Sequence, residues 1–273
     1  MLIQGSIIFT GNEVLNDGYV YVSGGRVAAL GEGNPPEEYT YANLVLGGRG
    51  RIIAPALVAA ADIILYPVRL WQLTREEKLN YYRNIRESTQ ALMAMPGVYE
   101  LHMSGVGTII VEAPSQSVVR EMEDMYGGEY HMADVLCENR GVFNVPEFCG
   151  GSVEGLYLRE QISYMLIGRK NVYEDSVKLA ESLGLPAPVI EEGVKARIAV
   201  FDSFNPPGMF LYERPDLASR VYEYLGVESL IVGDTVLVDI GEHLYITDND
   251  LSNVMNVVSV LKAKKKGLLG YSD

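Results

Sequence analysis

The sequence I-A-P-A-L-V-A-A-A-D-I at residues 53–63 lies between two regions of the chain that have different sequence patterns. It is a short apolar run behind one proline, with the length and composition of a buried strand. Residues 1–52, which precede it, are rich in glycine and predict β structure, with a hairpin loop at 23–25. The strands expected there are 18–22, 26–31, 44–46 and 51–54.

Beyond this run, the chain alternates between helical and strand patterns. Thr74 followed by Glu77 is a capping box, and it predicts a helix over about 75–95 that ends at Pro96-Gly97. The apolar run V-G-T-I-I-V-E (106–112) is typical of a strand buried on both faces of a parallel sheet. Two more helices are expected, one at 115–125 behind Ser115 or Ser117, and one at 172–183.

Strand patterns return after Gly193. The runs 196–202 and 229–242 predict three strands, with Gly233-Asp234 as a hairpin turn, and 251–264 predicts an amphipathic helix. Residues 130–156 have no clear period and predict one or two strands with long loops.

The fold class is therefore α/β plus β. We expect a small composite β-sandwich from both termini, with a truncated, incomplete-barrel α/β domain inserted into it. The predicted limits are 1–54 with 190–248 for the β-sandwich, 55–189 for the insertion, and 249–273 for a C-terminal helix and tail.

Composition excludes several classes of function. The formal charge of −14 argues against nucleic acid, because a duplex binder must neutralise phosphates. The basic run at 263–267 follows the last predicted helix, where lysines complement the helix dipole. No apolar run reaches the ~20 residues of a membrane span. The start M-L-I-Q-G-S-I-I-F-T-G has no basic and apolar leader pattern, so we expect a cytoplasmic protein.

Three stretches resemble the amidohydrolase superfamily, in particular its deaminase, chlorohydrolase and imidazolonepropionase-like members. The first is D-G-Y-V-Y-V-S-G-G-R-V-A-A-L-G-E-G (17–33). The second runs from A-E-S-L-G-L to I-E-E-G-V-K-A-R-I-A-V-F-D (180–202), and the third is L-I-V-G-D-T-V-L-V-D-I-G-E (230–242). The resemblance implies a β-sandwich built from both termini that flanks a metal-bearing (β/α)8 barrel.

Two departures from the family pattern bear on function. The family motif P-G-L-V-[ND]-x-H-x-H falls on 55–63, where its two histidines are replaced by Ala61 and Ile63, which offer no lone pair to zinc or iron. Between Asp62 and Pro188 there are only about 125 residues, whereas a closed barrel takes ~250. We therefore expect a truncated member that lacks the metal-binding histidines.

Other candidate residues are weaker. Cys149 precedes two glycines whose N–H groups would suit an oxyanion, and Cys137 is a second candidate nucleophile. Glu112 ends a predicted strand, at the edge where ligands of parallel sheets gather. His131 and Asp134 are three residues apart, and on a helix they could meet as metal ligands.

These observations favour a degenerate, non-catalytic protein with a binding, regulatory or assembly role and no cofactor. The alternative is a metal-dependent (zinc) or cysteine-dependent hydrolase of a non-peptide C–N bond in a small cyclic amide or amidine. An incomplete barrel leaves open sheet edges and apolar faces. We therefore expect a homo-oligomer, in particular a dimer, with a protein partner as a further option, and no nucleic-acid or membrane partner.

Overall fold

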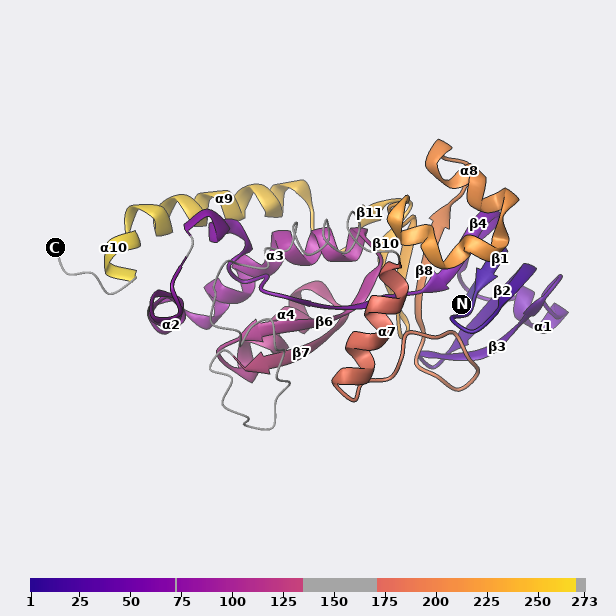
Figure 1. Cartoon of the computed structure of the whole chain (residues 1–273), viewed down its shortest axis with the longest axis horizontal. Helices are drawn as coiled ribbons and strands as arrows, with labels where there is room; N and C mark the ends of the chain where they lie inside the picture. The colour runs from indigo at the N-terminus through magenta and orange to yellow at the C-terminus, as the bar shows by residue number, and fades with distance from the viewer. Residues whose placement is uncertain (72, 135–170, 269–273) are drawn as a thin grey trace. The chain divides into compact units, whose positions relative to one another are not determined.

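The computed structural model describes residues 1–71, 73–134 and 171–268 (Figure 1). The chain divides into two compact units. Unit 1 comprises Met1–Val58, Leu101–Thr108 and Met165–Leu244, and unit 2 comprises Ala59–Glu100, Ile109–Tyr164 and Tyr245–Asp273. The domain limits expected from sequence stay a prediction.

Unit 1 is built on one sheet to which both ends of the chain contribute. Its strands are β1 (Leu2–Phe9), β2 (Val14–Ser23), β3 (Arg26–Glu32), β4 (Val45–Pro55), β8 (Arg197–Asp202), β9 (Ser229–Val232), β10 (Thr235–Asp239) and β11 (Glu242–His243). Their order is β11-β10-β9-β8-β4-β1-β2-β3. The β1–β4 pair is parallel, whereas β4 and β8 join the two ends of the chain antiparallel. The sheet is mixed and mostly antiparallel, and its closure into a sandwich stays a prediction.

Glycine sets the local geometry of this sheet at two places. Gly24 and Gly25 both have positive φ, 57° and 70°, and form a two-residue hairpin loop between β2 and β3, where we expected three residues. The strands expected at 44–46 and 51–54 are one continuous strand, β4. Gly47 lies in β4 with φ 76°, and a Cβ there would stand 2.2 Å from the Gln4 carbonyl oxygen. The glycines therefore bend this strand without ending it.

The core of unit 1 is an aliphatic cluster contributed by strands from both ends of the chain. Ile3 and Ile53 come from the N-terminal half, and Ile198 and Ile231 from the C-terminal half; all are fully buried. Burying a side chain of this size contributes roughly 1.5–3 kcal/mol. The core thus requires both ends of the sequence at once.

Within the residues that the structure describes, the helical segments that lie wholly in unit 1 are α1 (Glu37–Thr40), α7 (Val172–Ser182), α8 (Pro206–Glu213) and the 3-10 helix η2 (Pro215–Glu223). The helix expected at 172–183 is confirmed as α7. Its buried Ser176 bonds both the N–H and the carbonyl of Val58, at 2.7 and 3.0 Å. The helices α8 and η2 were not expected from the sequence.

A second sheet has three strands, in the order β5 (Leu57–Ala61), β6 (Val106–Ala113) and β7 (Glu129–Asp134). Every residue of β6 is buried, as the apolar run at 106–112 predicts. The helical elements of this part of the chain are η1 (Tyr66–Trp71), α2 (Arg75–Asn84), α3 (Glu87–Met103), α4 (Gln116–Tyr126), α9 (Asp248–Ala263) and α10 (Lys265–Leu268). The alternation of strands and helices is the α/β pattern expected from the sequence.

The single helix expected at 75–95 is wrong in two respects. The capping box of Thr74 and Glu77 is present, but α2 ends at Asn84 and α3 begins at Glu87. Gln90 stabilises this break, because its Nε2 donates to the carbonyls of Tyr82 and Ile85, both at 2.9 Å. Pro96 lies inside α3 and does not end it, although an interior proline removes a helical hydrogen bond and crowds the carbonyl four residues earlier. Val98 and Leu101, which follow it, are buried and hold the helix against the core.

Two smaller expectations about helices are also corrected. Ser115 precedes α4, but its hydroxyl makes no cap bond and instead donates to Glu87 at 2.5 Å. The C-terminal helix begins three residues earlier than expected, at Asp248, behind a capping box of Thr247 and Asp250. None of the helices in the described ranges has the length and apolar character of a membrane span.

Candidate functional site

A buried cluster of three charged residues lies where β5 and β6 end. Asp62 follows directly after β5, and Glu112 is the penultimate residue of β6. Lys78 extends from α2, and its ammonium group bonds Oδ2 of Asp62 at 2.7 Å and also Oε2 of Glu112. All three residues belong to unit 2.

The cluster is largely removed from water. Lys78 is 8% exposed and Glu112 is 2% exposed. Burial lowers the pKa of Lys78, but the carboxylates of Asp62 and Glu112 outweigh it, so that the pKa is raised overall. The amine is therefore held as an ammonium ion, and it cannot serve as a base or a nucleophile at neutral pH.

Two tyrosines of α2 lie next to this cluster. The Tyr82 hydroxyl lies 3.4 Å from Oδ1 of Asp62, and the rings of Tyr81 and Tyr82 meet edge to face. Burial, and then the charge of Asp62, raises the pKa of both phenols. Both tyrosines thus stay neutral, and the positive charge at the ends of the two strands comes from Lys78.

The side chains at the two positions where the family pattern has histidines are not suited to bind zinc. Ala61 and Ile63 are fully buried aliphatic side chains, which have no lone pair for a cation. Asp62, between them, bonds Lys78 and Tyr82. Within residues 1–71, 73–134 and 171–268, no group of three or more His, Cys, Asp or Glu side chains is arranged to hold a metal ion.

Among the other predicted site residues whose side chains the structure describes, one belongs to this cluster. Glu112 is a member of it, as its place at the end of a strand suggested. His131 and Asp134 both lie in strand β7 and not on the helix that their pairing required, and Nε2 of His131 lies 3.2 Å from Glu129. Cys137 and Cys149 lie outside the described residues.

A histidine pair in unit 1 was not found by sequence reasoning. Nδ1 of His102, near the end of α3, lies 2.9 Å from Nε2 of His243 in β11, and the two rings are stacked. Burial lowers the pKa of His102 to about 3, with a contribution from His243, and lowers that of His243 to about 4. Both rings are therefore neutral at pH 7. A separation of 141 residues gives no local signal for this contact.

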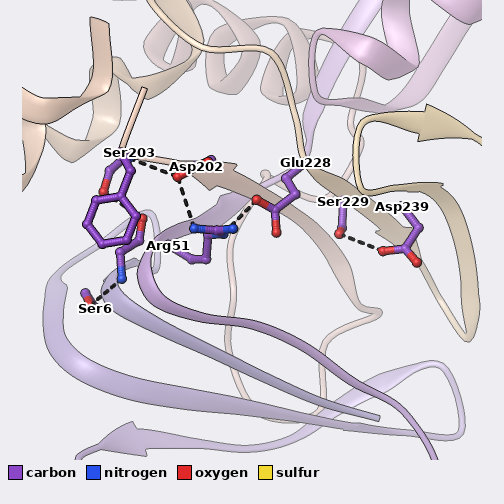
Figure 2. A network of polar contacts seen from close by, with 9 residues as sticks. Ser6, Arg51, Asp202, Ser203, Glu228, Ser229 and Asp239 are labelled. Carbon is purple, nitrogen blue, oxygen red and sulfur yellow. Dashed lines mark hydrogen bonds and ion pairs between the residues drawn. The ribbon is translucent and has the colours of Figure 1, made fainter. Parts of the chain in front are cut away.

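A polar network joins the two ends of the chain within the eight-stranded sheet (Figure 2). Arg51 of β4 contacts Asp202 of β8 at 3.0 Å and Glu228, which precedes β9, at 2.6 Å. Close by, Ser6 accepts a hydrogen bond from the Gly50 N–H, and Ser203 donates to the Gly50 carbonyl. Because the charge of Arg51 is paired with two carboxylates, we assign this network a structural role.

Comparison with solved structures identifies the fold. An atrazine chlorohydrolase from Arthrobacter aurescens TC1, solved with zinc, superposes with a TM-score of 0.67 at 12% identity, covering 98% of this chain and 99% of that chain. An adenosine deaminase from Xanthomonas campestris with bound zinc gives 0.65 at 10% identity, covering 96% and 98%. An amidohydrolase from Brucella melitensis gives 0.59 at 8% identity, covering 96% and 99%.

No protein-family model matches the chain, and no curated protein matches its sequence. At sequence identities of 8–12%, the structural similarity establishes the fold and not the activity. On this evidence the chain has the fold seen in amidohydrolase structures.

Proposed function

We propose that the chain is an amidohydrolase-like protein in which the ammonium group of Lys78, and not a metal ion, binds the carboxylates at the ends of β5 and β6. We propose that its role is binding, regulation or assembly. The observation that carries this proposal is the contact of Lys78 with both Asp62 and Glu112 beside the aliphatic side chains of Ala61 and Ile63. A cation at these strand ends would have to displace a buried lysine from both carboxylates.

The chemistry of the cluster supports a structural role for it. The ammonium ion of Lys78 bonds one oxygen of each carboxylate, from which we infer that neither is available as a general base. The flanking tyrosines are held neutral by burial. An attacking water molecule would therefore find no activating group among these five side chains.

Elemental analysis tests this proposal directly. Untagged protein, purified without chelator, is assayed for zinc, iron and manganese. We expect well under one metal ion per chain. A stoichiometric metal ion in the wild-type protein would contradict the proposal.

The comparisons support a second candidate function more directly than the first. The solved neighbours are a chlorohydrolase, a deaminase and an amidohydrolase. The second proposal is hydrolysis of a non-peptide C–N bond in a small cyclic amide or amidine. Water adds across the C–N bond, so that an amide gives a carboxylic acid and an amine, and an amidine gives an amide and an amine or ammonia. Cys137, Cys149, His131 and Asp134 are its candidate residues.

Two measurements separate the candidates. A panel of cyclic amides and amidines is incubated with the protein, with and without added zinc, and released amine is quantified. Iodoacetamide labelling, read by mass spectrometry, measures the reactivity of Cys137 and Cys149. Turnover that is lost in a Cys149→Ser or Cys137→Ser variant would establish the hydrolase, whereas absence of turnover together with unreactive thiols favours the first candidate.

A further inference from the structure

A group of basic side chains in unit 2 is formed by two segments that are far apart in the sequence. One segment is the end of α2, and the other is the junction of α9 and α10. A hydrogen bond joins them, because Nδ2 of Asn84 donates to the carbonyl of Leu268 at 3.1 Å, and Figure 1 shows α10 (yellow) next to α2. We define the basic patch as the cationic side chains of the two segments: Arg83, Arg86, Lys262, Lys264, Lys265 and Lys266.

The basic patch differs in charge from the rest of the chain. Segments 83–86 and 262–266 contain six of the 22 lysines and arginines and no aspartate or glutamate, in nine residues. The other 264 residues have 16 basic and 36 acidic side chains, a net charge of −20. The sequence alone explains the lysines as partners of a helix dipole, but that role does not require the two arginines of the α2 segment beside them.

Most of the charge of the basic patch is not neutralised by ion pairs. Within the part of the chain that the structure describes, the two arginines, Lys262 and Lys264 form no ion pair, and all four side chains are exposed. Lys265 lies 5.1 Å from the ring centre of Trp71, a contact that positions its ammonium group and leaves it charged. Asp250 of α9 is 12 residues before Lys262, about 18 Å along a helix axis, so it screens the patch little.

The small extent of the basic patch decides which kind of anion fits it. At 0.15 M ionic strength, charges act over about 8 Å, so a ligand confined to the patch meets its positive charge and not the −20 of the other residues. A nucleic-acid duplex, with one charge per ~1.7 Å of its axis, or an anionic membrane extends past the patch to the acidic remainder. A short acidic peptide segment covers the patch alone, and arginine binds both oxygens of one carboxylate.

We propose that the basic patch binds a short acidic segment of a protein partner. The carboxylates of that segment pair with the exposed arginines of the α2 segment and with the lysines around the end of α9. This goes beyond the function proposed above, because it gives a place and a chemistry to a partner. It does not rest on the ion cluster of Lys78, so metal content and partner binding can fail separately.

The test compares two variants of equal charge. The double variant Lys262→Glu, Lys264→Glu reverses two charges of the basic patch, and Arg49→Glu, Lys178→Glu reverses two exposed charges of unit 1; both take the net charge from −14 to −18. The probe is a fluorescein-labelled peptide of eight glutamates, and its binding to the full chain is measured by fluorescence anisotropy in 50 mM NaCl. The dissociation constant should rise about tenfold in the patch variant and less than about twofold in the control variant.

A single variant tests whether the two segments form one surface. Arg83→Glu should also raise the dissociation constant of the glutamate peptide, whereas Arg49→Glu should not. A short DNA duplex and phosphatidylserine vesicles, as the other possible anions, should bind more weakly than the peptide. The proposal is overturned if either of them binds more tightly, if the wild-type protein shows no saturable binding of the peptide, or if the patch and control variants lose affinity equally.

Discussion

The ammonium group of Lys78 lies between the buried carboxylate of Glu112 and the partly buried carboxylate of Asp62, so removing it has a different energetic effect from removing the whole cluster. Lys78→Met leaves Asp62 and Glu112 close together without a counter-charge, and we expect it to lower the free energy of unfolding by about 3–5 kcal/mol. The triple variant Asp62→Asn, Lys78→Met, Glu112→Gln removes all three charges and should be less destabilised than Lys78→Met alone. Urea denaturation measures both values, and equal losses in the two variants would show that the three charges are not coupled.

The histidine pair predicts how stability depends on pH. Burial holds the pKa values of His102 and His243 at about 3 and about 4 in the folded protein, below the ~6.5 of an unfolded chain. Below pH 6.5 the unfolded chain therefore takes up protons that the folded pair does not. Stability should fall as the pH drops from about 6.5 towards 4, by up to about 1.4 kcal/mol per pH unit for each histidine.

A double variant isolates this contribution from that of the many carboxylates. In His102→Gln, His243→Gln the loss of stability between pH 7 and pH 5, measured by urea denaturation, should be smaller than in the wild type. His131→Gln, which changes a histidine outside the pair, should leave the wild-type dependence intact. An identical pH dependence in the wild type and the double variant would contradict this account.

At the scale of elements, Ser176 joins α7 to the start of β5. Its hydroxyl bonds both the N–H and the carbonyl of Val58, and its side chain is fully buried. Ser176→Ala leaves these two backbone groups without this partner, so we expect a loss of about 1–3 kcal/mol in the free energy of unfolding. Ser182→Ala, on an exposed face of the same helix, should change stability by less than about 0.5 kcal/mol, and equal losses in both variants would contradict the role of Ser176.

The break between α2 and α3 is a boundary that the sequence pattern did not predict. The capping box at Thr74 places the start of α2 correctly, because its two hydrogen bonds involve residues three apart. The end of α2 depends on Gln90, whose amide reaches back to carbonyls five and eight residues earlier. Glutamine is a common helix former, and nothing in its spacing indicates this role.

At the scale of the whole molecule, the charge of −14 predicts how salt affects self-association. Two copies of a chain that each carry a charge of −14 repel each other. Salt screens this repulsion over a Debye length that shrinks from about 30 Å at 0.01 M to about 8 Å at 0.15 M. The dissociation constant of the dimer should therefore decrease as NaCl is raised from 10 to 300 mM, which sedimentation equilibrium can measure. A dimer that weakens with salt would instead indicate a contact between opposite charges.

The sequence by itself indicated the α/β pattern in the middle of the chain, the positions of both hairpin turns and the amidohydrolase-like fold. These features follow from hydrophobic periodicity and from glycine and capping residues, which act over a few positions. It also indicated the aliphatic side chains of Ala61 and Ile63 and the place of Glu112 at a strand end.

Only the tertiary structure decided which distant side chains meet. It placed Lys78 on carboxylates 16 and 34 residues away, paired His102 with His243, and joined Arg51 to Asp202 and Glu228. Such contacts depend on how whole elements pack, and packing is set by the shape and burial of the complete core. A pattern of neighbouring residues has no information about that shape, so the partners of these charges were not predictable from the sequence.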